Sequence, residues 1–158
     1  MTVVTGRRTH TPTDTLTIFA IGMRVNTLFR PDAWLPTLAA MGPMIAELSR
    51  DPGSGFLGAR TLLGWRGPTV LQYWRSTTDL YRYASDTSSR HRPAWTAFNA
   101  RARKKPGAVG IWHETYQVSA AETMYVDTPV MGLAAATGSE AVGSRSDRAA
   151  QRLAAGSR

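Results

Sequence analysis

The stretch Gly110-Ile111-Trp112-His113-Glu114-Thr115-Tyr116 is rich in aromatic and β-branched residues, and it predicts a β-strand. Neighbouring residues of a strand point to opposite faces of the sheet. One face therefore carries Ile111, His113 and Thr115, and the other carries Trp112, Glu114 and Tyr116. His113 and Glu114 cannot form a simple acid–base pair. We predict that His113 faces a cavity under this sheet; the structural alternative is a half-buried histidine bonded to a backbone carbonyl.

The composition is that of one globular domain. The chain has 158 residues, of which 42% are hydrophobic and 19% charged. It contains no cysteine, which excludes disulfides, thiolate catalysis and cysteine-based zinc sites. We expect a cytoplasmic protein, because this composition suits a reducing compartment.

The formal net charge of +8 raises the question of an anionic partner. The basic residues are dispersed, and the one cluster, Arg101 to Lys105, falls where a helix is expected to end. They do not alternate with aromatic residues as in a single-strand binder. No apolar run approaches the roughly 20 residues of a membrane span, and no cleavage site follows Arg7-Arg8. We therefore expect neither nucleic acid nor membrane among the partners.

The order of predicted elements is β-α-β-β-α-β. The expected strands cover residues 15–26, 56–65, 69–75 and 109–118, with a Gly67-Pro68 turn in the hairpin and a short edge strand at 121–126. The expected helices cover 32–49 with Asp32 as the N-cap, a short piece that Ser76 caps, and 91–103. This is a ferredoxin-like α+β arrangement. We assign residues 14–132 to this domain, 1–13 to an N-terminal arm and 133–158 to a flexible or draping C-terminal tail.

The faces of two predicted elements can be assigned from the sequence. In the first strand, Phe19, Ile21, Met23 and Val25 share a large apolar face, and the other face ends in Arg24 and Asn26. That second face can serve either a ligand or a subunit interface. In the first helix, Trp34, Leu38, Met41, Ile45 and Leu48 form one apolar stripe, which we assign to the core.

Several strings of residues resemble a family of small monooxygenase-like proteins. They are Gly6-Arg7-Arg8-Thr9, Ile21 to Asn26, Gln72 to Ser76, His91 with Pro93-Ala94-Trp95, Phe98-Asn99, Gly110 to Tyr116 and Tyr125 to Pro129. The best-known type of member acts in a fumagillin-like secondary-metabolite pathway. The family looks related to the antibiotic-biosynthesis monooxygenases of the dimeric α+β barrel superfamily.

The resemblance implies a homodimer with a pocket between sheet and helices in each subunit, and oxidation of a small organic substrate without a required cofactor. Such chemistry needs a base, donors for a developing anion and a dry cavity. His113 is the first candidate for the base and His91 the second, with Asn26 and Arg24 as donors. Trp74, Tyr83 and Trp95 are candidate walls, although the core is the alternative place for these rings. Trp112 is also assigned to substrate binding.

Two alternatives stay open. Haem-degrading relatives in the superfamily place a histidine ligand on the corresponding helix and an asparagine on the first strand, so the resemblance allows haem held by His91 near Asn26. The other alternative is a non-catalytic dimeric ligand-binding domain, in which Arg24 and Glu114 form a cross-strand ion pair and His113 is a satisfied polar group. No glycine-rich dinucleotide fingerprint is present in the sequence.

Overall fold

The computed structural model describes residues 2–86, 91–104 and 106–156, and leaves out the side chains of residues 44, 91–95, 101 and 102. Its larger part is a four-stranded antiparallel sheet with the strand order β3-β4-β2-β5. The strands are β2 (Leu16–Val25), β3 (Phe56–Gly64), β4 (Gly67–Trp74) and β5 (Val109–Val118). In chain order they form the predicted ferredoxin-like arrangement, in which the first and third strands, β2 and β4, pair at the centre of the sheet and β3 and β5 form its edges.

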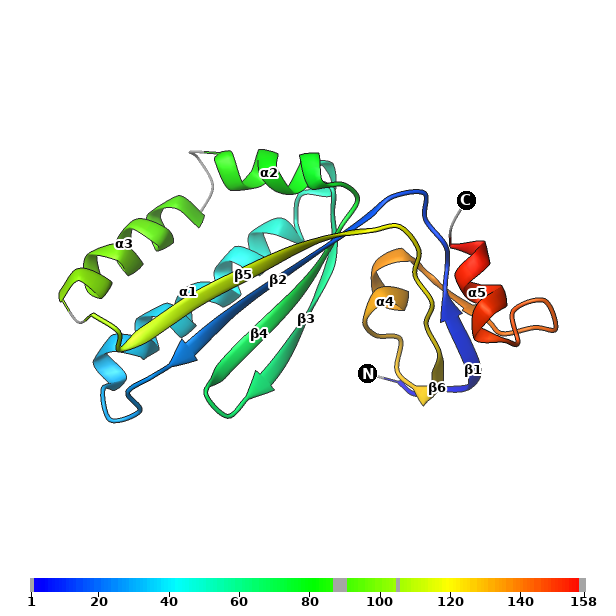
Figure 1. Cartoon of the computed structure of the whole chain (residues 1–158), viewed down its shortest axis with the longest axis horizontal. Coiled ribbons are helices and arrows are strands. Elements are labelled where there is room, and N and C mark those ends of the chain that lie inside the picture. The colour runs from blue at the N-terminus through cyan, green and yellow to red at the C-terminus, as the bar shows by residue number, and fades with distance from the viewer. Residues whose placement is uncertain (1, 87–90, 105, 157–158) are drawn as a thin grey trace.

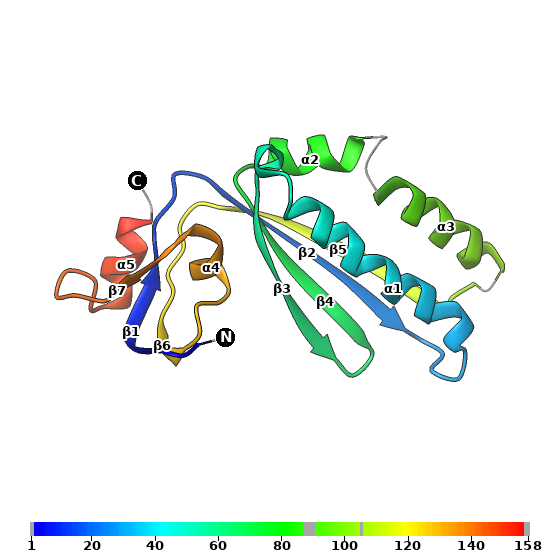
Figure 2. The same ribbon diagram turned by 180° about the vertical axis from the view of Figure 1, so that it is seen from behind.

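Helices cover one face of this sheet (Figures 1 and 2). They are α1 (Pro31–Leu48), α2 (Thr77–Ser85) and α3 (His91–Lys104), and a short 3-10 turn, η1 (Pro52–Ser54), precedes β3. The predicted cap of α2 is present, because the Ser76 hydroxyl accepts a 3.0 Å hydrogen bond from the Asp79 backbone N–H. The α1 N-cap is Arg30 rather than the expected Asp32, which lies in the first turn.

The hairpin turn lies two residues before the predicted position. Gly64 pairs with Gly67, so Trp65 and Arg66 form the turn, and Pro68 already belongs to β4. Gly67 has a φ of +140°, and a Cβ atom there would lie 2.2 Å from the Met23 carbonyl oxygen. The glycine is therefore required by the close approach of the β2 backbone, not by the turn itself.

The two ends of the chain form a second, smaller sheet. Its strand order is β6-β1-β7, with β1 (Val4–His10), β6 (Tyr125–Thr128) and β7 (Ser139–Ala141). The helices α4 (Leu133–Thr137) and α5 (Ala149–Ala155) accompany it. The predicted edge strand at 121–126 thus starts later and pairs with β1 instead of the main sheet.

Both the expected N-terminal arm and the expected C-terminal tail contribute strands to this second sheet. The C-terminal segment has few large apolar side chains, but its strand β7 pairs with β1, and this backbone pairing orders the segment. The Arg152 guanidinium adds an ion pair with Glu122 and donates to the Ser146 and Asp147 carbonyl oxygens, each at 2.8 Å. The C-terminal segment is therefore ordered by hydrogen bonds and one partly buried ion pair, which a search for apolar periodicity does not detect.

Two apolar clusters lie on opposite faces of the main sheet. Leu48, Trp74 and Leu80 pack together on the face under the helices. Leu16 and Tyr73 pack with Leu133 of α4 on the other face. α4 covers one end of that second face, and no other described element covers the rest of it. No helix in the described part of the chain is long and apolar enough to cross a membrane.

Candidate functional site

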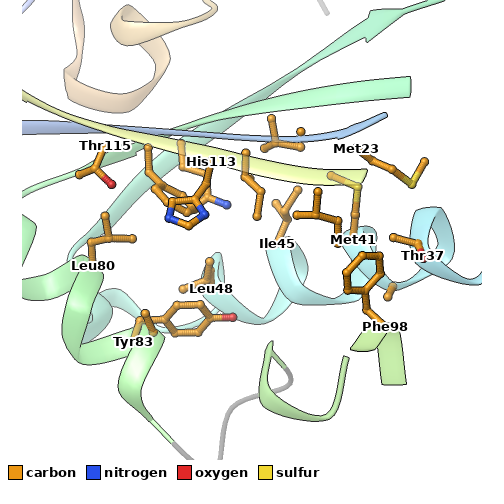
Figure 3. A pocket seen from close by; sticks show the side chains of 18 of the residues that line it. Met23, Thr37, Met41, Ile45, Leu48, Leu80, Tyr83, Phe98, His113 and Thr115 are labelled. Atoms are coloured by element: carbon orange, nitrogen blue, oxygen red, sulfur yellow. The ribbon is translucent and has the colours of Figure 1, made fainter. Parts of the chain in front are cut away.

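A cavity of about 400 Å³ lies between the main sheet and its three helices (Figure 3). This volume is within the range of pockets that hold small organic ligands. Apolar side chains dominate the described lining, and it contains no Asp, Glu, Lys or Arg side chain. The polar side chains that line it are Thr37, Gln72, Tyr81, Tyr83, His113 and Thr115.

Strand alternation places the cavity side chains of β2 and β5. In the register of the two strands, Phe19 lies opposite Thr115, Ile21 opposite His113 and Met23 opposite Ile111. All six residues line the cavity. The predicted cavity face of β5 is therefore the face that the structure presents to the helices.

His113 lies on the sheet side of the cavity, with its imidazole directed toward the helices (Figure 3). Its ring centroid is 5.5 Å from that of Phe19. The side chain is exposed, and within the described part of the chain its ring nitrogens have no hydrogen-bond partner. The imidazole is thus accessible to a molecule in the cavity, unlike the bonded interior histidine of the structural alternative.

Tyr83 of α2 faces His113 across the cavity (Figure 3). Burial raises the pKa of Tyr83 to about 12, and the Glu47 and Asp86 carboxylates act in the same direction. Its hydroxyl is therefore protonated at neutral pH and serves as a hydrogen-bond donor rather than as a base. The site thus combines one group able to accept a proton with one that keeps its proton.

Trp74, a predicted wall residue, is a core residue that does not line the cavity. Its side chain is 0% exposed and packs against Phe56 and Tyr83, with ring centroids 5.4 and 5.8 Å away. The Trp74 indole N–H donates a 3.0 Å hydrogen bond to Gln72 Oε1. It therefore supports the cavity from behind by holding Tyr83 and Gln72, both of which line it.

The structure does not bring Arg24 and Asn26 together with His113. Neither lines the cavity. Arg24 Nε donates to Asn26 Oδ1 at 3.2 Å, and Asn26 Nδ2 donates to the Gly107 carbonyl oxygen at 2.9 Å. Asn26 holds the start of β5 to the end of β2, because its amide bonds the backbone just before β5. Asn26 therefore lies outside the cavity that His113 lines.

Trp112 lies on the open face of the sheet, away from the cavity. Its ring covers Gly22, where a Cβ atom would lie 2.3 Å from Trp112 Cε2. The cross-strand ion pair of the non-catalytic alternative is also not formed, because Arg24 lies opposite Gly110 whereas Glu114 lies opposite Ala20. Glu114 instead accepts a 2.5 Å hydrogen bond from the Tyr116 hydroxyl.

The side chains of His91 and Trp95 lie outside the described residues. Phe98, on the same helix, lines the cavity. Among the described residues, no group of three or more His, Asp or Glu side chains could hold a metal ion. The roles assigned to His91 and Trp95 therefore stay predictions.

The helical wall of the cavity is one that the sequence pattern assigns to the core. Met41, Ile45 and Leu48 of the predicted stripe line the cavity, and Thr37 and Ala40 extend this surface. Gln72 of β4 is a further lining residue that the pattern does not single out. Helical periodicity identifies an inward face but does not distinguish a filled interior from a hollow one. The sequence does contain a signal for Gln72, because it is a polar residue at a position that strand alternation predicts to be buried.

Comparison with known proteins gives a family for this chain. No curated protein matches the chain. The chain is similar to the solved structure of a conserved protein of unknown function and possible oxidoreductase from Bacteroides thetaiotaomicron, with 11% identity and a TM-score of 0.48 over 67% of this chain and 100% of that one. Another is SnoaB, a cofactor-independent oxygenase from Streptomyces nogalater, with 15% identity and a TM-score of 0.48 over 66% of this chain and 93% of that one.

A third is a putative antibiotic biosynthesis monooxygenase from Chloroflexus aurantiacus, with 16% identity and a TM-score of 0.38 over 73% of this chain and 95% of that one. The family model described as monooxygenase af470-like matches residues 16–133, which covers the main sheet and its helices. The resemblance noted in the sequence is thereby confirmed, and the chain belongs to the monooxygenase af470-like family.

Proposed function

We propose that this protein is a homodimeric oxygenase that oxidises a neutral, largely apolar small molecule of the secondary-metabolite type in the cavity beside His113. The observation that carries the proposal is an accessible imidazole in a cavity whose described lining has no Asp, Glu, Lys or Arg side chain. Such a lining disfavours a substrate with a carboxylate or phosphate inside the cavity, because its charge would be desolvated without a partner. It suits a phenolic or similarly conjugated substrate.

In the proposed reaction His113 acts as the base. Its imidazole takes a proton from an acidic C–H or O–H of the substrate, which leaves a delocalised anion. That anion gives electrons to dioxygen, the oxidant, and forms a C–O bond to it at a carbon that still carries a hydrogen. His113 returns its proton to the outer oxygen, so that the first product is a substrate hydroperoxide. Loss of water from the peroxide then leaves one oxygen atom on the substrate as a carbonyl and reduces the other to water. The balance needs no further reductant and no cofactor.

Tyr83 completes this assignment. Its hydroxyl keeps its proton at neutral pH and can donate a hydrogen bond to the oxygen on which negative charge develops. The apolar lining of Phe19, Ile21, Met41 and Phe98 limits the access of water to the anion.

The open face of the sheet supports the dimer in this proposal. Large side chains on it are partly exposed, including Trp112 at 38% and Tyr116 at 51%. Apolar surface of this kind on an antiparallel sheet is usually covered by another layer. A second copy that packs there leaves the cavity of each subunit intact, because the cavity lies on the other face.

The test is oxygen consumption by the purified protein with a panel of phenolic, polyketide-like compounds and no added cofactor. His113→Ala should lower turnover about 10²-fold to 10⁴-fold, which is the usual contribution of a positioned base. Glu114→Gln is the matched control, because it changes the next residue of β5 on the opposite face, and turnover should stay the same.

Two outcomes would contradict the proposal. Unchanged turnover in His113→Ala, with the fold intact by circular dichroism, would remove His113 from the chemistry. A Soret band in the protein as isolated, together with activity that follows haem content, would establish the haem alternative instead.

A further inference from the structure

One end of the main sheet exposes large apolar side chains. Phe29, in the loop between β2 and α1, is 94% exposed, and Leu63 and Trp65, at the β3–β4 turn, are 87% and 80% exposed. Leu28 and Leu62 beside them are also exposed. Isolated apolar side chains are common on protein surfaces, but a group of this kind usually marks an interaction site. We call these five residues, together with the basic residues Arg24, Arg30, Arg66, Arg103 and Lys104 of the same end, the tip surface.

Hydrogen bonds join the three segments at this end into one surface. The Val25 backbone N–H donates to the Arg66 carbonyl oxygen at 2.6 Å, which holds the hairpin turn against the end of β2. The Asn26 N–H donates to the Ala108 carbonyl oxygen at 3.0 Å, which holds the start of β5 on the other side. Figures 1 and 2 show these segments at the end of the molecule away from β1, β6 and α5.

The same end is strongly basic. Residues 24–34, 62–68 and 103–110 contain Arg24, Arg30, Arg66, Arg103 and Lys104 among the described residues, and Asp32 is their one acidic residue. Asp32 is paired with Arg30 at 3.2 Å. The Arg66 guanidinium lies 4.3 Å from the centroid of the Trp65 ring, so a cation and an aromatic ring are presented together. The chain has 11 acidic residues in all, and the others lie elsewhere in the sequence.

We propose that the tip surface binds the surface of an anionic lipid bilayer. Exposed aromatic and aliphatic side chains enter the boundary between headgroups and acyl chains, and cations around them are attracted to anionic headgroups. A tryptophan next to an arginine suits that boundary, because its ring is amphipathic. This proposal departs from the expectation of no membrane partner, which rested on the absence of an apolar run long enough to span a bilayer. This inference is independent of the proposed reaction.

The test is cosedimentation of the full chain with vesicles of phosphatidylcholine alone or mixed with phosphatidylglycerol. Binding should require the anionic lipid and should weaken as salt is raised. The double variant Phe29→Ser, Trp65→Ser should bind at least about tenfold more weakly, because both apolar anchors are lost. The double variant Arg103→Gln, Lys104→Gln should lose roughly fivefold for each cation removed.

Matched controls lie at the far end of the molecule. Val126→Ser removes an apolar side chain of β6 that is 51% exposed, and Arg145→Gln, Arg148→Gln removes two cations near α5. Both variants should bind the vesicles as the unaltered protein does. Quenching of the unaltered protein's fluorescence by brominated lipid, compared with that of Trp65→Phe, should show that Trp65 enters the bilayer, without relying on the serine variants.

Three outcomes would overturn the proposal. The first is equal or no binding to the two kinds of vesicle. The second is a change of oligomeric state in Phe29→Ser, Trp65→Ser by light scattering, which would make the tip surface a contact between copies of the chain. The third is binding to a DNA duplex that survives the serine substitutions while vesicle binding is absent, which would assign the cations to nucleic acid.

Discussion

The two faces of β5 have different surroundings although they belong to the same ten residues. Ile111, His113 and Thr115 face the helices and line the cavity. Trp112 and Tyr116 face away from the helices on a part of the sheet that no described element covers, and the Trp112 ring lies over Gly22 of the neighbouring strand. The cavity face has a hollow with an accessible imidazole, whereas the open face has aromatic surface without a second layer.

This difference shows how a strand can separate chemistry from assembly. Adjacent residues such as His113 and Glu114 are close along the chain but lie on opposite sides of the sheet. In our proposal the cavity face carries out the oxidation and the open face pairs the subunits. A substitution on one face should therefore leave the property assigned to the other face unchanged, and the following predictions use that expectation.

The largest effect on assembly is expected for Trp112→Ala. If the open face is the dimer interface, loss of this ring should raise the dimer dissociation constant at least about thirtyfold, which corresponds to a hot-spot cost of about 2 kcal/mol. Analytical ultracentrifugation measures this change. His113→Ala on the other face should leave the dissociation constant as it is. A Trp112→Ala protein that dimerises normally would assign assembly to another surface.

Gly22→Ala gives a second measurement of the same contact. The added Cβ atom would lie 2.3 Å from Trp112 Cε2, so the ring must move. The dimer should weaken in the same direction as in Trp112→Ala, and the free energy of unfolding should fall by about 1–3 kcal/mol because of overpacking.

A smaller effect is expected on the cavity face for Tyr83→Phe. With its pKa raised to about 12, Tyr83 donates a hydrogen bond over the whole neutral pH range. Loss of that one neutral hydrogen bond should reduce kcat about tenfold, with the dimer unchanged. Steady-state oxygen consumption measures kcat, and an unchanged value would exclude Tyr83 as the donor.

The smallest effect is expected from the terminal sheet, which belongs to neither face. His10 of β1 is buried, and its Nδ1 lies 2.9 Å from Thr123 Oγ1. Burial lowers the pKa of His10 below its ordinary value of 6.5, and the Glu140 and Glu122 carboxylates offset this only in part. As the pH falls, His10 therefore takes up a proton at a higher pH in the unfolded chain than in the folded one. The free energy of unfolding decreases as the pH falls below about 6.5.

The variant His10→Asn keeps a hydrogen-bond acceptor near Thr123 and removes this titration. Between pH 7 and a mildly acidic pH, its melting temperature should fall a few degrees less than that of the unaltered protein. Turnover and dimerisation should match the unaltered protein at neutral pH. A parallel decline of the two melting temperatures would show that other groups cause the acid sensitivity.

The sequence by itself determined the main sheet and the side of β5 that carries His113. The alternation of Ile111, His113 and Thr115 with aromatic and charged neighbours is a local property of an extended chain, so it can be found without knowing what packs on either side. The same holds for the Ser76 cap of α2, which bonds a backbone group three residues away. The family followed from strings of residues in this same part of the chain.

Only the tertiary structure decided where Arg24, Asn26 and Trp74 lie relative to the cavity, because that position depends on the register between distant strands and on which helices cover them. The same is true of the C-terminal segment, whose order comes from pairing with β1 at the other end of the chain. Whether the stripe of α1 encloses a solid core or a cavity also depends on how far the helix lies from the sheet. Local patterns determine which way a side chain points, but long-range packing determines what it meets there.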